Sequence, residues 1–238
     1  MIEATYIDHM GSDLSVVNAA RVSFGKKSQF KITTTDEVDD SGLHFGHMHF
    51  DLYDKDKRLI RYLAKHKHIS PFGHAFASFH VKAPIFVARQ LVKHKFLRWN
   101  EVSRRYVDDE PEFYVPDVWR GRSADKKQGS SDTTVDFLRM QGFSEQSVHD
   151  GTVKHQMHSL DLYRDMLTAG VAPEQARMIL PQSTMTEWYW SGSLDAFASM
   201  CQLRCKPDTQ YESRLVADQI SEMMQELFPV SWAALMET

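Results

Sequence analysis

The stretch around Pro84 constrains the fold most, because it requires a strand to change directly into a helix. In residues 75–83, AFASFHVKA, the polar residues Ser78, His80 and Lys82 alternate with small or apolar ones, and this period of two is typical of a strand. Pro84 stops the strand, and its fixed φ angle suits the first turn of a helix that we expect to reach Val92. The chain therefore contains both sheet and helix.

The rest of the sequence predicts an α+β fold in one domain spanning residues 1–238. Helices are expected over residues 11–24, 51–66, 144–168, 173–180, 194–205 and 208–227. A further strand is expected over residues 184–192, TMTEWYWSG. The segments 25–49 and 120–134 are polar and are predicted to be surface loops. We find no internal repeat and no long linker.

Composition and charge exclude several classes of protein. Hydrophobic residues make up 42% of the 238 residues, too many for a disordered chain and enough for a core that needs no disulfide or structural metal. No apolar run is long enough to span a membrane, and no secretion signal opens the chain, so we expect a cytoplasmic protein. The net charge of −4 argues against a nucleic-acid-binding protein, so an anion site must come from a local basic cluster.

The two cysteines, Cys201 and Cys205, lie four residues apart in a predicted helix. Residues at this spacing share a helix face, but two thiols form neither a zinc site nor a disulfide framework. We predict that both are reduced packing residues, and that the protein has no metal site.

Residues 89–105, RQLVKHKFLRWNEVSRR, form the strongest local concentration of positive charge. The cations are Arg89, Lys93, Lys95, Arg98, Arg104 and Arg105. Glu101 is the single acid among them, so a counter-anion is expected, either a protein carboxylate or a bound phosphate. Trp99, Asn100 and Ser103 add hydrogen-bonding groups of both polarities, as a small-molecule site needs. The alternative is a solvated basic face of a helix.

This cluster resembles the signature of the flavin-dependent thymidylate synthases, Arg-His-Arg followed by seven residues and Ser. Here Lys93-His94-Lys95 is followed by seven residues and Ser103, and NEVSRRY is similar to the family's Asn-Glu-x-Ser-x-Arg-Tyr. Five further blocks are similar to family segments in the same order: GSDLSVVNAARVSF, HKHISPFGH, FHVKAPIFVARQ, APEQARMILP and LRCKPDTQYE. The resemblance covers most of the chain, and residues 25–49 and 117–145 match least.

The resemblance implies an antiparallel β-sheet packed with helices, the thymidylate synthase-complementing-protein-like fold. It also implies a homotetramer with active sites between subunits. The implied reaction is the reductive methylation of dUMP to dTMP, with the carbon from methylenetetrahydrofolate and the electrons from NADPH through bound FAD. No enzyme cysteine attacks the pyrimidine in this family. The two cysteines here, which lack an obvious base partner, agree with that.

The resemblance assigns one set of residues to dUMP. These are Gln90, Lys93, Glu101, Val102, Ser103, Arg104, Arg105, Arg177 and Arg204. Arg204 is the predicted catalytic residue, because a guanidinium stays charged and offers a planar pair of donors to the uracil edge. We interpret Ser103 as a binding residue, since no histidine lies at the spacing of a base. Each of three residues also has a purely structural alternative. Ser103 would be a cap or turn hydroxyl, and Arg177 would be a surface arginine. Arg204 would be an arginine at a helix C-terminus that pairs with a carboxylate.

A second set is assigned to FAD: Ser70, Lys93, His94, Lys95, Phe96, Glu101, Ser193 and Ser199. His68 is placed at the folate or the flavin edge, with a structural turn as the alternative. The lysines at 93 and 95 keep the charge of the family's arginines but lose the bidentate fork. Asp195 and Asp208 stand where the family often has arginine and histidine, and Gly73 replaces an acid common in the turn.

Three other functions stay open from the sequence. The first is a related enzyme that installs another one-carbon group on dUMP, such as hydroxymethyl. The second is a single-stranded nucleic-acid-binding module that stacks bases on Trp99. The third is a metal protein built on His44, His47 and His49.

Overall fold

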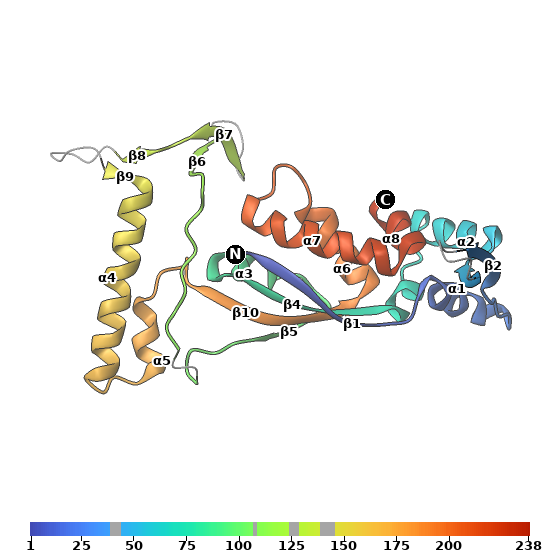
Figure 1. Ribbon diagram of the computed structural model, residues 1–238, viewed down its shortest axis with the longest axis horizontal. Helices are drawn as coiled ribbons and strands as arrows, with labels where there is room; N and C mark the ends of the chain where they lie inside the picture. The colour runs from blue at the N-terminus through green and yellow to red at the C-terminus, as the bar shows by residue number, and fades with distance from the viewer. Residues whose placement is uncertain (39–43, 107–108, 124–128, 139–145) are drawn as a thin grey trace.

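A four-stranded antiparallel sheet lies at the centre of the computed structural model, which describes residues 1–38, 44–106, 109–123, 129–138 and 146–238 (Figure 1). The strand order is β1-β4-β10-β5. The strands are β1 (Glu3–Met10), β4 (Phe76–Pro84), β10 (Met185–Ser193) and β5 (Leu97–Glu101). The predicted antiparallel sheet is thereby confirmed, including the strands expected over 75–83 and 184–192. β1 and β5 were not anticipated.

The alternation seen in β4 decides which face of the sheet is buried. Phe79 and Val81 are fully buried and pair with Trp190 and Trp188 of β10, which are also buried. Trp99 of β5 stacks on Trp188 with the ring centres 4.3 Å apart. Offset aromatic pairs of this kind add stability beyond the area that they bury.

Helices cover this apolar face and one end of the sheet (Figure 1). Two of them, α6 (Leu194–Arg204) and α7 (Tyr211–Leu227), lie along the sheet. α1 (Asp13–Arg21) and α2 (Asp54–Lys65) lie at its end, and α8 (Pro229–Met236) packs against α2, α6 and α7. Their buried side chains, such as Phe197, Ile220 and Trp232, form one core with those of the sheet. The short helix α3 (Ile85–Leu91) follows β4 directly, as Pro84 predicts.

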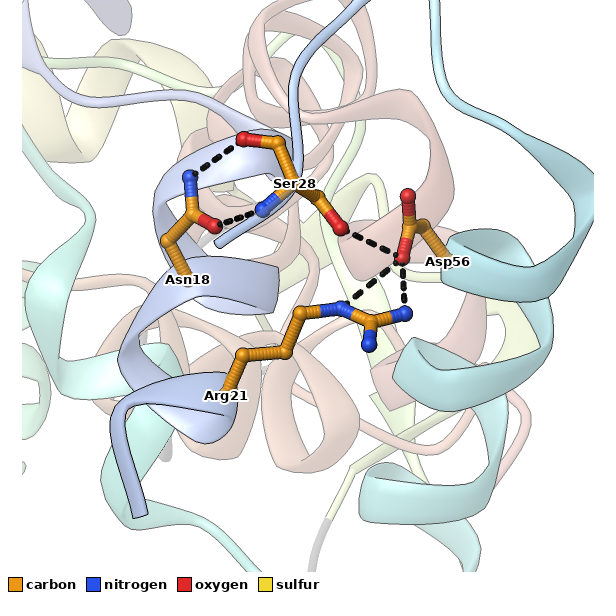
Figure 2. A network of polar contacts seen from close by, with 4 residues as sticks. All are labelled: Asn18, Arg21, Ser28 and Asp56. Atoms are coloured by element: carbon orange, nitrogen blue, oxygen red, sulfur yellow. Dashed lines mark hydrogen bonds and ion pairs between the residues drawn. The ribbon is translucent and has the colours of Figure 1, made fainter. Parts of the chain in front are cut away.

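A polar network joins α1 to α2 (Figure 2). Asp56 is completely buried, and its Oδ1 accepts bonds from both Nε and Nη2 of Arg21 and, at 3.0 Å, from the Ser28 hydroxyl. Asn18 exchanges two hydrogen bonds with the backbone of Ser28. A buried carboxylate needs such partners, so the segment after α1 is held against α2 by charge as well as packing.

The long helix α4 (Val148–Thr168) stands beyond the other end of the sheet (Figure 1). It packs with α5 (Pro173–Ala176) and the 3-10 turn η3 (Arg177–Ile179) around a small core of Leu160, Tyr163 and Ala176. The strand pairs β6 (Arg120–Arg122) with β7 (Ser130–Thr134) and β8 (Phe137–Leu138) with β9 (Gln146–Ser147) lie near the start of α4.

Two loop predictions are wrong. Residues 25–49 contain most of a hairpin of β2 (Lys31–Val38) and β3 (His44–Asp51), and the run of β-branched residues from Ile32 to Thr35 is the signal that favours a strand there. Residues 120–134 contain β6 and β7. The helices expected over 51–66, 173–180, 194–205 and 208–227 are present, whereas α8 was not anticipated. No helix of the described part of the chain is long and apolar enough to cross a membrane.

Candidate active site

A cavity of about 720 Å³ collects most of the residues that were predicted to contact the flavin. It lies among the turn after α3, the outer side of α6 and the ends of α2 and α8. Its polar or charged lining residues include Lys67, Lys93, His94, Lys95, Asp195, Ser199, Gln202 and Arg204. Residues that are 110 positions apart in the sequence, His94 and Arg204, thus share one cavity. We call it the flavin cavity.

Strained backbone shapes this cavity at two positions. Lys67 and Phe96 have φ angles of +56° and +65°, and they are the two non-glycine residues of the described chain with positive φ. Both line the flavin cavity. A Cβ on Gly192 would lie 3.3 Å from the carbonyl oxygen of Phe96, so glycine lets β10 approach this turn closely. Conformations that cost energy are concentrated at binding sites, which points to a functional cavity.

Arg204, the predicted catalytic residue, is oriented by His94. Its Nε donates to Nε2 of His94 at 3.0 Å. Burial, with a contribution from the charge of Arg204, lowers the pKa of His94 to about 4. The ring is therefore neutral at pH 7, with Nε2 as acceptor. Burial also lowers the pKa of Arg204, but a guanidinium remains charged. The pairing of His94 with Arg204 was not foreseen from the sequence.

The lowered pKa of His94 predicts a pH dependence of stability. In the unfolded chain the imidazole takes up its proton near pH 6.5, whereas in the folded protein it does so only near pH 4. Proton uptake by the unfolded state therefore destabilises the protein as the pH falls from 6.5 to 4. Urea unfolding at pH 7.5, 6 and 5 should show a smaller loss of stability in His94→Gln than in the wild type. Equal losses of stability in the variant and the wild type would contradict the lowered pKa of His94.

The chemistry of the lining residues fits a dinucleotide. Lys93 and Lys95 are exposed cations that can neutralise a pyrophosphate. Oδ1 of Asp195 is buried and has no hydrogen-bond partner among the described residues, so it is an acceptor for a ligand donor such as a hydroxyl or an amino group. Phe96 is 82% exposed and offers an aromatic face. Ser199 also lines the cavity, whereas Ser193 begins α6 without lining it.

The other residues assigned to dUMP lie outside the flavin cavity. Ser103 and Arg105 form a unit after β5, in which Nε of Arg105 donates to the Ser103 hydroxyl at 3.3 Å. Arg177 is exposed on η3, where its Nε donates to the carbonyl of Glu174. Three groups, around Arg204, Ser103 and Arg177, therefore carry most of the predicted dUMP contacts, and Gln90 lies on α3.

Internal contacts occupy several of these predicted ligands. The amide of Gln90 donates to Gln210 and accepts a bond from the Ser213 hydroxyl. Glu101 accepts bonds from Trp99 and Thr186. Nη1 of Arg104 donates to the carbonyl of Asp109 at 2.7 Å, and Val102 is 42% exposed.

His68 and Ser70 line a second cavity, which shares Lys67 and Ile69 with the flavin cavity. Lys67 was not picked out from the sequence as a site residue, although it lies in the block HKHISPFGH beside His68 and Ser70, which were. Within the described residues, no three His, Cys, Asp or Glu side chains gather in a way that could hold a metal. Of the histidines raised as ligands, His49 bonds with Thr35, and the side chains of His44 and His47 lie outside the described part.

Comparison with known proteins shows the family of this chain. Residues 5–230 match the family described as thymidylate synthase complementing protein. A flavin-dependent thymidylate synthase of Thermus thermophilus is 36% identical over 97% of this chain and 74% of its own length, and one of Thermosipho africanus is 34% identical over 97% and 89%. The crystal structure of the UMP/dUMP methylase PolB from Streptomyces cacaoi, bound with 5-Br dUMP, superposes with a TM-score of 0.76 at 29% identity, covering 100% of this chain and 95% of that one. The chain therefore belongs to the thymidylate synthase complementing protein family, that of the flavin-dependent thymidylate synthases.

Proposed function

We propose that the protein methylates dUMP to dTMP, using methylenetetrahydrofolate as the carbon donor and NADPH as the reductant through bound FAD. The observation that carries the proposal is the pair of Arg204 and neutral His94 inside a cavity whose other lining cations suit a dinucleotide. Family membership supports the same activity.

In this proposal Arg204 acts on the uracil ring. Its Nε is held by His94, while its two terminal nitrogens make no hydrogen bond with another described residue. These donors can therefore face the uracil edge and stabilise the negative charge that develops when the ring is activated. The positive charge of Arg204 would repel a protonated His94 at this distance. The neutral imidazole of His94 is therefore part of the arrangement.

FAD, when bound, supplies hydride transfer. Lys93 and Lys95 would neutralise its pyrophosphate, and Asp195 would accept a hydrogen bond from its ribose or adenine end. The loss of the arginine fork at positions 93 and 95 leaves single charge-assisted contacts there.

A second copy of the chain would complete the nucleotide site. The Ser103 and Arg105 pair and the exposed Arg177 do not line the flavin cavity of their own chain. They are accessible to a ligand held by another subunit, and this supports the homotetramer with sites between subunits that the family resemblance implies.

The test is the mass of the product. Protein purified with a yellow colour and a flavin absorption band is incubated with dUMP, NADPH and methylenetetrahydrofolate. We expect a nucleotide heavier than dUMP by one methylene group. A product with an additional oxygen would indicate hydroxymethylation instead. Colourless protein that binds single-stranded DNA in a salt-dependent way would favour the nucleic-acid alternative.

The comparison with PolB favours a second candidate substrate, the ribonucleotide UMP. That neighbour is described as a UMP/dUMP methylase and is also similar in its structure with 5-Br UMP, with a TM-score of 0.75. The same incubation with UMP in place of dUMP tests this candidate, and an unchanged nucleotide mass would exclude it.

A further inference from the structure

A third cavity lies apart from the residues that were assigned to a ligand. It measures about 500 Å³ and lies among the start of α3, the start of α7, α4 and the strand pair β6–β7. None of the residues assigned to dUMP, FAD or folate lines it. Part of its wall, residues 118–120 and 129–130, belongs to the segment 117–145 that matches the family least. We call it the aromatic cavity, and its volume is that of a small-molecule site.

Two contacts hold the β6–β7 strand pair against the start of α7. The guanidinium of Arg120, which begins β6, lies 3.9 Å from the ring centre of Tyr211, which begins α7. Gly129, just before β7, has a φ angle of +90°, and a Cβ there would lie 2.7 Å from the carbonyl oxygen of Asp208. Glycine therefore allows a close approach that a side chain would prevent. Contacts on both strands of the pair thus fix the wall of the aromatic cavity.

Four aromatic rings line the aromatic cavity. They belong to half-buried residues, Phe86, Tyr114, Trp119 and Tyr211. The rings of Phe86 and Tyr114 are tilted, with their centres 6.1 Å apart. A flat ring that enters the cavity can stack on such side chains, and the guanidinium over Tyr211 extends the stacking surface. Stacking on aromatic side chains is favourable for every nucleobase, because every base has a π face. The walls therefore favour a flat aromatic ligand.

The lining also offers hydrogen-bond donors and an acceptor. Nε1 of Trp119 is buried and has no hydrogen-bond partner among the described residues, so it is a donor without an acceptor there. Burial, together with the charge of Glu212, raises the pKa of Tyr114 to about 12, so its hydroxyl stays protonated well above pH 7. Oε2 of Glu212 accepts a bond from Gln210 at 3.2 Å, and Oε1 accepts none from a described residue. The edge of a nucleobase carries both donors and acceptors, and it complements this set.

The charge of the lining favours an uncharged ligand. Arg120 and Glu212 are the two charged residues that line the aromatic cavity, and their charges cancel. A phosphate group would be attracted by Arg120 but repelled by Glu212. We propose that the aromatic cavity binds an uncharged nucleoside, with its base stacked among the four rings and its edge hydrogen-bonded to Trp119 and Glu212. This site is separate from the nucleotide site of the proposed function and does not depend on it.

The test is calorimetric binding of two nucleosides, thymidine and adenosine, to the purified protein with and without saturating dUMP. We expect at least one of them to bind with a Kd below about 1 mM in both conditions. Trp119→Leu removes a ring and a donor, so it should weaken this binding at least about fivefold. Trp119→Phe keeps a ring but loses the indole N–H, so its loss should be smaller. The phenylalanine variant also tests the site should the leucine variant fail to fold.

Phe137→Leu is the matched control, because Phe137 is an exposed aromatic residue of β8 that does not line the aromatic cavity. It should bind the nucleosides as tightly as the wild type. Absence of binding by both nucleosides, or binding that is unchanged in both Trp119 variants, would overturn the proposal. Binding that saturating dUMP abolishes would also overturn it, since the nucleoside would then occupy the nucleotide site.

AMP tests the assignment to an uncharged ligand. It should gain little over adenosine, because its phosphate meets Glu212 as well as Arg120. AMP binding more than about tenfold more tightly than adenosine would overturn that assignment. Formation of dTMP tests the proposed function separately, so the two failures are distinguishable.

Discussion

Replacing Arg204 with alanine is expected to lower the rate of dTMP formation by at least about 100-fold, while the protein keeps its flavin. The guanidinium is held by His94 and, in the proposed function, donates to the uracil edge. Removing a fixed donor that acts on developing charge typically costs this much or more. The flavin should remain, because Lys93, Lys95 and Asp195 still line the cavity.

The measurement is anaerobic turnover with deuterated reductant, with flavin content read from the absorption spectrum. Arg204→Lys keeps a positive charge but loses the planar pair of donors, so it should recover only a small part of the rate. Lys206→Ala, which removes an exposed cation two residues further along the chain, should leave turnover unchanged. Unchanged turnover in Arg204→Ala would remove this residue from its role.

Replacing Asp56 with alanine is expected to destabilise the protein by about 3–5 kcal/mol, the largest effect on stability that we predict. The carboxylate is fully buried and accepts the bonds of Arg21 and Ser28. Without it the largely covered guanidinium of Arg21, 20% exposed, loses its partner in the described network. The joint between α1 and α2 would then carry an uncompensated charge.

Urea unfolding at neutral pH measures this loss. Asp54→Ala is the matched control, since Asp54 is an exposed acid in the same first turn of α2 and should cost less than about 1 kcal/mol. Ser28→Ala removes one of the bonds and should give a smaller loss than Asp56→Ala. Equal stabilities of Asp56→Ala and Asp54→Ala would show that the network contributes little.

The parts of the fold that could be predicted are those in which local pattern and tertiary packing agree. The period of two in β4 matches its buried face, and Pro84 sits where strand changes to helix. β5, Leu97–Glu101, has no such pattern, because it is mostly exposed and is a strand only through its pairing with β10. The helix α8 is short and apolar on all sides, so it has no helical periodicity.

The candidate site likewise has a part that could be predicted from the sequence and a part that could not. Lys93, His94, Lys95 and Phe96 adjoin in sequence, and a single turn brings them to one cavity. The bond between His94 and Arg204 depends on how α6 packs against that turn, which no local pattern encodes. Lys67 lies in the block HKHISPFGH, but its place in the same cavity as Lys93 emerges only from the fold.

The left-handed backbone at Lys67 and Phe96 has a consequence for engineering. Glycine tolerates that conformation, so a selection for heat resistance would favour glycine at both positions. Each such gain would remove a cation or an aromatic ring from the wall of the flavin cavity. Thermostable variants enriched in glycine at these two positions would thus hold their prosthetic group less firmly.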